Sequence, residues 1–589
     1  MPLCVARQCN VWGVSRSAAR PLQSTISTQW RRAYSIQPIE GGEQGAVLRK
    51  PKSAIIIPRS VAVSPDDLIK HIKPLEIHEY RNYRFALFLL TPSFAQWLLE
   101  GNTFLEKAVH QAFSPVLQST AFAKVHAFAA VVDKLPSPQA IHEPPQWGLP
   151  RDRSSPPNVD NELGNEGLAY KFLRPHNVVR SAHRSNMDEK GSISFILSEA
   201  SDGRVETSRL IRLPLANTVF QTGAHSTMAL STWEKPKNRQ ELAIVSKSEL
   251  IHQEFRLDSS KAVSQDTVFS IPLVPLTMPR VVDAAMGNIL RRVIGSDGKV
   301  ITASEELEKA VPQYFKSRDE PSQSISVWAL VIPNNMRELV NNDFHRLVAE
   351  IQLDEGKSNS GVTTDIWAQL WKNGGRTWSP LVVNALNAGC RLYRVLSGGG
   401  GWGKKAGLLS LDPAFNNEEL EGPTVAATPI NLQGLDEISS ALRQVVKPGE
   451  LIQFFTSSSV AKVYEQSSED IPEDLKKLES LYTPWTGEYG TIPSTVDALQ
   501  SNSWQHAVSN EGRSGESFVF LDNFGALSEG GMTFRVQERI ITPDSIATVN
   551  GCKIDVPFSW LGTREESHDP NAIATTNGKR AVPDERVRP

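Results

Sequence analysis

Residues 84 to 90 read RFALFLL, a nearly continuous apolar run that has the length of a strand. A run of this kind predicts a buried strand. A helix is expected directly after it, with Ser93 as its cap and a division at Gly101 and Asn102. A second strand-like run, KVHAFAAVV, covers residues 124 to 132. Together these elements predict a small α/β module over residues 35–133.

The pattern of the chain changes after this module. Residues 134–162 hold seven prolines among polar residues, which is typical of a linker or loop. We place this linker at 134–165, a central α+β domain at 166–333 and a C-terminal α+β domain at 334–561. Residues 562–589 are polar and lack apolar periodicity, which predicts a disordered tail. The expected fold class is α+β: mixed sheets with packed helices, two or more fused domains and disordered termini.

Several helices are expected after residue 239. Residues 240–255 are predicted to be helical. Residues 280–294 follow Pro279, end at Gly295 and repeat apolar side chains at helical spacing, namely Val282, Ala285, Met286, Ile289, Leu290 and Val293. Further helices are expected from Ser304, over 335–353, from Ser379 to Gly389 and over 433–447. Strands are expected at 192–196, 209–213, 324–332, 390–396, 408–412, 451–456, 518–521, 533–541 and 547–556.

The N-terminus has the composition of a mitochondrial presequence. The first 34 residues contain five arginines, six serines or threonines and no acid. Such a segment is drawn inward by the membrane potential, which favours each positive charge by roughly 2.3 kcal/mol per 100 mV. The tail Arg32-Ala33-Tyr34-Ser35 resembles a processing site, so we expect cleavage between Tyr34 and Ser35. The expected location is the matrix or the periphery of the inner membrane.

Composition excludes several classes of function. Without the presequence the chain has 57 basic and 65 acidic residues and a net charge of −8, so any contact with nucleic acid requires a local basic patch. Only Cys390 and Cys552 remain, far apart in sequence, which predicts no disulfide framework, no metal site and no cofactor. The most apolar stretch, residues 85–99, is too short and too interrupted to be a transmembrane segment.

One motif resembles a phosphate-binding loop. Gly398, Gly403 and Lys404 match the spacing GxxxxGK, in which backbone N–H groups and a lysine hold phosphates. Lys405 occupies the place of the Mg²⁺-binding hydroxyl. Residues 408–412 read as a strand, whereas the phosphate site needs a helix N-terminus there.

The same segment is better explained as a hairpin with a basic tip. It combines cations with an aromatic ring, which suits contact with phosphates and stacking on bases. The candidate partner-binding residues are Arg391, Arg394, Trp402, Lys404 and Lys405. An ordinary glycine-rich loop with solvated lysines is the alternative. No catalytic residues are assigned, because the sequence contains neither GxSxG nor HExxH.

The presequence, residues 279–292 (PRVVDAAMGNILRR) and the glycine-rich segment 398–405 together resemble fungal mitochondrial proteins of uncharacterised function. Some proteins of that kind are associated with mitochondrial gene expression. The resemblance implies a role in gene expression and supplies no catalytic residues.

The expected function is therefore that of a binding or assembly factor in mitochondrial gene expression, with RNA or a protein of the translation machinery as partner. One alternative is a nucleotide-binding protein or enzyme that uses residues 398–405. A further alternative is an assembly factor for a respiratory complex. The oligomeric state is left open.

Overall fold

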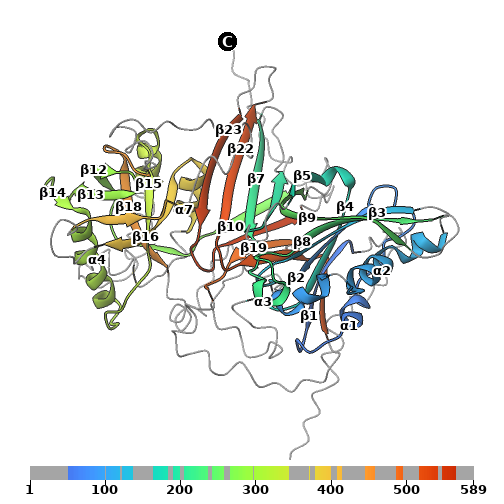
Figure 1. Ribbon diagram of the computed structural model, residues 1–589. Coiled ribbons are helices and arrows are strands. Elements are labelled where there is room, and N and C mark those ends of the chain that lie inside the picture. Colours follow the sequence, from blue (N-terminus) through green and yellow to red (C-terminus); the bar gives the residue numbers. More distant parts are fainter. Residues whose placement is uncertain are drawn as a thin grey trace, which may run out of the picture. The chain divides into compact units, whose positions relative to one another are not determined.

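The computed structural model describes residues 51–99, 101–119, 123–136, 164–183, 190–198, 205–236, 242–257, 265–295, 297–343, 371, 379–398, 407–413, 445–457, 486–494, 517–540 and 547–565. The chain is mostly β, with 47% strand against 22% helix. The predicted α+β class is therefore wrong. The described residues form three sheets, one of which is closed into a barrel (Figure 1).

The largest sheet has twelve strands. Its order is β20 (Ser517–Leu521), β1 (Ser53–Pro58), β4 (Leu168–Leu173), β2 (Phe85–Leu90), β3 (Ala123–Val131), β8 (Met228–Lys235), β9 (Ala243–Arg256), β6 (Ser192–Ser198), β7 (Val205–Pro214), β22 (Met532–Ile540) and β23 (Ala547–Ile554), with β5 (Val178–His183) paired to β9. Strands from all three expected domains thus share one sheet.

The prediction that residues 84–90 form a buried strand is confirmed. Strand β2 pairs in parallel with β3, and the chain between them forms the helices η2 (Pro92–Leu98) and α2 (Phe104–Ser119). Ala86, Phe88 and Leu90 pack in the core beneath these helices and α1 (Pro65–Ile69), whereas the odd-numbered residues between them face a second core. The continuous apolar run reflects burial on both faces.

A four-stranded sheet supplies side chains to that second core. It contains β10 (Gln265–Ser270), β24 (Trp560–Glu565), β19 (Gly487–Thr491) and β21 (Phe524–Ser528), in this order. The ring of Tyr489 packs on Phe195 of the large sheet, with their centroids 4.8 Å apart. Strand β24 includes residues 562 to 565 of the predicted disordered tail, and the rest of that tail lies outside the described residues.

The third sheet closes into a six-stranded barrel because β15 pairs with β18. Around the barrel run β18 (Leu451–Ser457), β12 (Arg280–Met286), β13 (Ile289–Ile294), β17 (Leu409–Leu411), β16 (Arg391–Gly398) and β15 (Val327–Ile332), while β11 (Leu273–Pro275) and β14 (Val300–Thr302) extend it. Helix α4 (Ala303–Ser317) lies beside the barrel and contacts β13 and β14 (Figure 1). It buries Leu307, Tyr314 and Phe315 in the barrel core.

The barrel contacts the large sheet through polar atoms as well as apolar ones. The indole N–H of Trp328 on β15 donates a 2.8 Å hydrogen bond to Oδ1 of Asp555. The backbone N–H of Leu392 on β16 donates to Sγ of Cys552 on β23 at 3.1 Å. Helix α7 (Ser379–Asn387) packs beside β10, β16 and β23.

The predicted helix over 280–294 is wrong. The segment forms the hairpin of β12 and β13, with pairs that include Val282 with Val293 and Ala285 with Leu290. Gly287 has a φ of 60°, which is the backbone conformation required at the first central position of a type II′ hairpin turn. The strand partners on both sides of the hairpin, β18 and β17, override the helical spacing of its apolar residues.

The predicted helix over 240–255 is also wrong, because residues 243–256 form the long strand β9. Its first half pairs with β8, and its second half lies between β6 and β5. The predicted strands at 192–196, 209–213, 324–332, 390–396, 408–412, 451–456, 518–521, 533–541 and 547–556 are confirmed in their described parts, although the strand expected from 324 begins at residue 327.

Of the other predicted helices, those beginning near Ser304 and at Ser379 are confirmed as α4 and α7. The predicted helix over 335–353 begins with η4 (Asn334–Met336) and is helical through residue 343. Its remainder lies outside the described residues, as do the presequence and residues 433–444 of the helix predicted over 433–447. Residues 445–447 of that predicted helix are described and are not helical. Among the helices that the structure does describe, none is both long and apolar enough to span a membrane.

Candidate functional site

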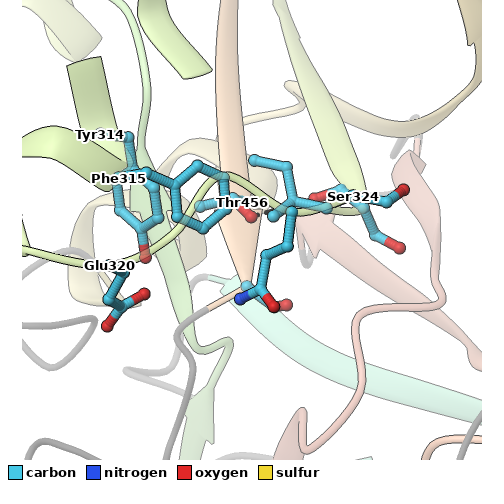
Figure 2. Close-up of a pocket in the computed structure, with 9 residues that line it drawn as sticks. Tyr314, Phe315, Glu320, Ser324 and Thr456 are labelled. Carbon is cyan, nitrogen blue, oxygen red and sulfur yellow. Dashed lines mark hydrogen bonds between the residues drawn. The ribbon is translucent and has the colours of Figure 1, made fainter. Parts of the chain in front are cut away.

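A polar pocket of about 180 Å³ lies where α4 ends beside the barrel (Figure 2). Tyr314, Phe315 and Thr456 are buried and form its floor. Gln323 and Ser324 are exposed and form its rim. The pocket thus opens to the surface at Gln323 and Ser324.

The C-terminal end of α4 shapes one wall of this pocket. After the capping residue Arg318, Asp319 adopts the left-handed conformation, with a φ of 54°. The backbone N–H of Glu320 then donates a 3.0 Å hydrogen bond to the carbonyl of Phe315. This reversal satisfies a carbonyl of the last helical turn and brings the Glu320 side chain back beside Tyr314, as Figure 2 shows.

The ring of Tyr314 is held between two neighbours. The guanidinium of Arg318 lies 5.3 Å from its centroid, and the ring of Trp371 contacts it edge-on at 5.8 Å. Trp371 is fixed in turn, because its indole N–H donates to the carbonyl of Pro275 at 2.8 Å. Burial raises the pKa of Tyr314, so its hydroxyl keeps its proton and can both donate and accept a hydrogen bond.

A hydrogen-bond network forms the opposite wall. Thr456 donates from its hydroxyl to the carbonyl of Ser326 at 3.0 Å. Arg394 donates from Nη2 to the hydroxyl of the same serine at 3.3 Å. Arg394, a predicted partner-binding residue, therefore supports the pocket wall.

The pocket carries little net charge. Its carboxylate, Glu320, forms an ion pair with Nε of Arg318 at 3.2 Å. Both side chains are nearly buried, with exposed fractions of 9% and 6%. The other polar groups that line the pocket are hydroxyls and the amide of Gln323.

Arg391 lies away from this wall. It forms an ion pair with Glu450 at 3.3 Å and contacts the ring of Tyr393. Side chains alternate between the two faces of a strand, so residues 391 and 394 of β16 lie on opposite faces. The structure therefore does not bring the two arginines together.

The glycine-rich segment links two strands that pair with each other. Gly398 on β16 pairs with Leu409 on β17, and the two strands are antiparallel. Trp402, Gly403, Lys404 and Lys405 lie between these strands and outside the described residues. Because a strand follows the segment, the described structure has no helix where a phosphate-binding loop requires one.

The hairpin returns to the barrel far from the pocket. Gly407 accepts a 3.3 Å hydrogen bond at its carbonyl from the backbone N–H of Ser304, in the first turn of α4. The pocket lies at the other end of that helix, which has 15 residues and is therefore ~22 Å long. The described ends of the hairpin and the pocket are separate places on the barrel.

Cys390, Cys552 and His252 are poorly suited to nucleophilic or acid–base catalysis. Burial raises the pKa of both the Cys390 and the Cys552 thiol to about 12, and a buried neutral thiol is a poor nucleophile. Burial lowers the pKa of His252 to about 4, although its Nδ1 lies 2.9 Å from the Ser192 hydroxyl. Within the described ranges no three His, Cys, Asp or Glu side chains are grouped as a metal site.

Sequence reasoning missed the pocket. Its lining residues come from two segments, 314–326 and 456–457, which are separated by about 130 residues. The sequence signal was the pair Tyr314-Phe315 at the end of an amphipathic helix, followed by a polar segment. No protein-family model, curated protein or solved structure matches the chain.

Proposed function

We propose that this chain is a binding or assembly factor in mitochondrial gene expression. In this proposal, it contacts RNA or the ribosome through the tip of the hairpin between β16 and β17. One observation carries the proposal: the two strands pair antiparallel in the wall of a closed barrel. Residues 399–406, which include Trp402, Lys404 and Lys405, connect these two strands in the sequence.

Electrostatics explains why a tip rather than a whole face is proposed. A net charge of −8 on the processed chain repels a polyanion at long range. Two adjacent lysines provide local attraction to phosphates, and the tryptophan adds stacking of about 1–3 kcal/mol per base. The presequence composition supports location in the matrix or at the inner membrane.

Crosslinking in intact mitochondria tests this proposal. A tagged chain is crosslinked to RNA, purified under denaturing conditions and its RNA sequenced. The variant Trp402→Ala/Lys404→Gln/Lys405→Gln is compared with Lys73→Gln/Lys247→Gln, which removes two exposed lysines of the large-sheet region. We expect enrichment of organelle RNA that the first variant loses and the second keeps. Equal recovery from both variants, or no enrichment, contradicts the proposal.

The same material discriminates the alternatives. A nucleotide-binding protein that uses residues 398–405 would show a nucleotide-dependent rise in melting temperature that Lys404→Ala abolishes. The strand β17 in place of a helix argues against this outcome. An assembly factor would instead co-migrate with respiratory subunits on native gels.

A further inference from the structure

We infer that the pocket at the end of α4 binds an uncharged planar heterocycle with hydrogen-bond donors and acceptors on its edge, which is the chemistry of a nucleobase. This inference deepens the proposed function, because an unstacked base of a bound RNA is one source of such a ring. A free nucleobase or nucleoside is the other source.

The size of the pocket limits the ligand to a small ring system. Pockets for drug-sized ligands enclose about 300–1,000 Å³, whereas this pocket encloses about 180 Å³. It accommodates one ring system but not a ring together with its sugar and phosphates. The exposed rim at Gln323 and Ser324 leaves room for a sugar to remain in solvent.

The charge of the pocket selects against ions. Its carboxylate at Glu320 is already paired with Arg318, and the remaining polar groups are neutral. A buried anion or cation without an opposite charge is strongly disfavoured. An uncharged ligand meets no such penalty.

The lining combines apolar and polar side chains. Phe315 and Ile325 provide the apolar contact. The hydroxyls of Tyr314 and Ser457 and the amide of Gln323 supply both donors and acceptors. Unstacked bases are recognised by this combination of aromatic contact and hydrogen bonds to the base edge.

The position of the Tyr314 hydroxyl is fixed before any ligand binds. Arg318 and Trp371 hold the ring from two sides, and the residue is 3% exposed. A donor held in place in this way loses little conformational entropy on binding. Removal of this single hydroxyl should therefore lower the affinity for the ligand without altering the shape of the pocket.

Isothermal titration of the full chain with the four ribonucleosides and with short single-stranded RNA tests the assignment. We expect at least one nucleoside to bind with one-to-one stoichiometry. Tyr314→Phe should lower the affinity for that nucleoside about fivefold, which is the effect of losing one hydrogen bond of ~1 kcal/mol. The matched control is Tyr393→Phe, which changes another buried barrel tyrosine outside the pocket lining and should change affinity less than twofold.

A second pair of variants does not depend on the core. Ser324→Trp fills the exposed rim and should abolish binding, whereas Ser322→Trp, two residues earlier and also exposed, should leave it intact. The inference is overturned if the folded chain binds neither nucleosides nor RNA at millimolar concentration, or if Ser324→Trp binds normally. Tighter binding of RNA than of nucleosides that Ser324→Trp weakens identifies a base of an RNA strand as the source. Tighter binding of a nucleoside identifies a free ring.

The two proposals can fail separately. Nucleoside binding that Ser324→Trp abolishes, together with no RNA crosslinked in mitochondria, keeps the pocket assignment and contradicts the proposed function. Crosslinks that depend on the hairpin, together with no ligand for the pocket, keep the proposed function and contradict the pocket assignment.

Discussion

The carboxylate of Asp133 accepts a 2.8 Å hydrogen bond from the backbone N–H of Glu529. The hydroxyl of Ser528 donates to the same oxygen at 3.3 Å. One carboxylate therefore joins the chain after β3 to the turn after β21, nearly 400 residues later. Burial raises the pKa of Asp133 to about 6.

This raised pKa predicts the pH dependence of Asp133→Asn. The folded state binds a proton more tightly than the unfolded state, so the carboxyl contributes stability at low pH that is lost as the pH rises to about 6. Relative to the variant, the wild-type chain should gain ~2 kcal/mol between pH 7.5 and pH 4.5. Urea unfolding at the two pH values measures this difference.

Asp297→Asn is the control for that experiment. Hydrogen bonds from Lys299 lower the pKa of Asp297 below its ordinary value of 3.8. The contribution of this carboxylate to the free energy of unfolding therefore changes only as the pH falls below that value. The stability difference from wild type should be the same at pH 7.5 and 4.5. An unchanged difference for Asp133→Asn as well would show that its carboxyl is not held as described.

Gly407 and Gly298 have similar backbone angles, but we expect their substitution by alanine to destabilise the fold to different extents. Gly407 and Gly298 have φ values of 83° and 76°, so both substitutions should cost ~1–2 kcal/mol for the left-handed conformation. A Cβ at Gly407 would also lie 2.8 Å from Cβ of Thr302, whereas none of the atoms around Gly298 lies within 4 Å. Gly407→Ala should therefore lower the urea midpoint clearly more. Equal losses would contradict the packing of the hairpin on α4.

The bond between Trp328 and Asp555 should couple the barrel to the large sheet energetically. A hydrogen bond to a charged acceptor contributes roughly 1.5–3 kcal/mol. A double-mutant cycle of Trp328→Phe and Asp555→Ala should give a coupling energy of about 1–3 kcal/mol in unfolding experiments. A coupling energy near zero would show that the 2.8 Å contact contributes nothing to stability.

Burial of Cys390 and Cys552 predicts slow alkylation. Both thiols should resist iodoacetamide at pH 8 in the native chain and react in urea, since only the exposed thiolate is nucleophilic. Peptide mass spectrometry measures each cysteine separately. Ser322→Cys supplies an exposed thiol as a positive control. If Cys390 or Cys552 were labelled as fast as this introduced thiol, the burial of that cysteine would be refuted.

Local sequence patterns predicted where most helices and strands lie. For some segments they did not predict correctly whether the segment is a helix or a strand. The apolar run at 84–90 is a buried strand because both of its faces pack in cores, and such runs are legible in sequence. The hairpin of β12 and β13 was predicted as a helix because Val282, Leu290 and Val293 fit helical spacing. The missed signal was Gly287-Asn288, a favoured two-residue turn.

The candidate site was predictable only in part. Residues 399–406 stand out by composition, and the hairpin that carries them follows from two predicted strands. The pocket depends on Thr456 meeting Ser326 across the barrel, and no local pattern specifies that closure. Arg391 and Arg394 lie on opposite faces of β16 because side chains alternate along a strand. The prediction that grouped the two arginines rested on composition and did not take this alternation into account.

The binding of short single-stranded RNA to the purified chain, measured at several salt concentrations, tests the central claim most directly. Affinity for single strands falls with salt by a slope of about 0.7 per phosphate contact. Lys404→Gln/Lys405→Gln should weaken binding and reduce that slope by ~1.4, whereas Lys73→Gln/Lys247→Gln should match the wild type. The same affinity and slope in all three proteins, or no binding by the wild type, would contradict the proposed role of the hairpin tip.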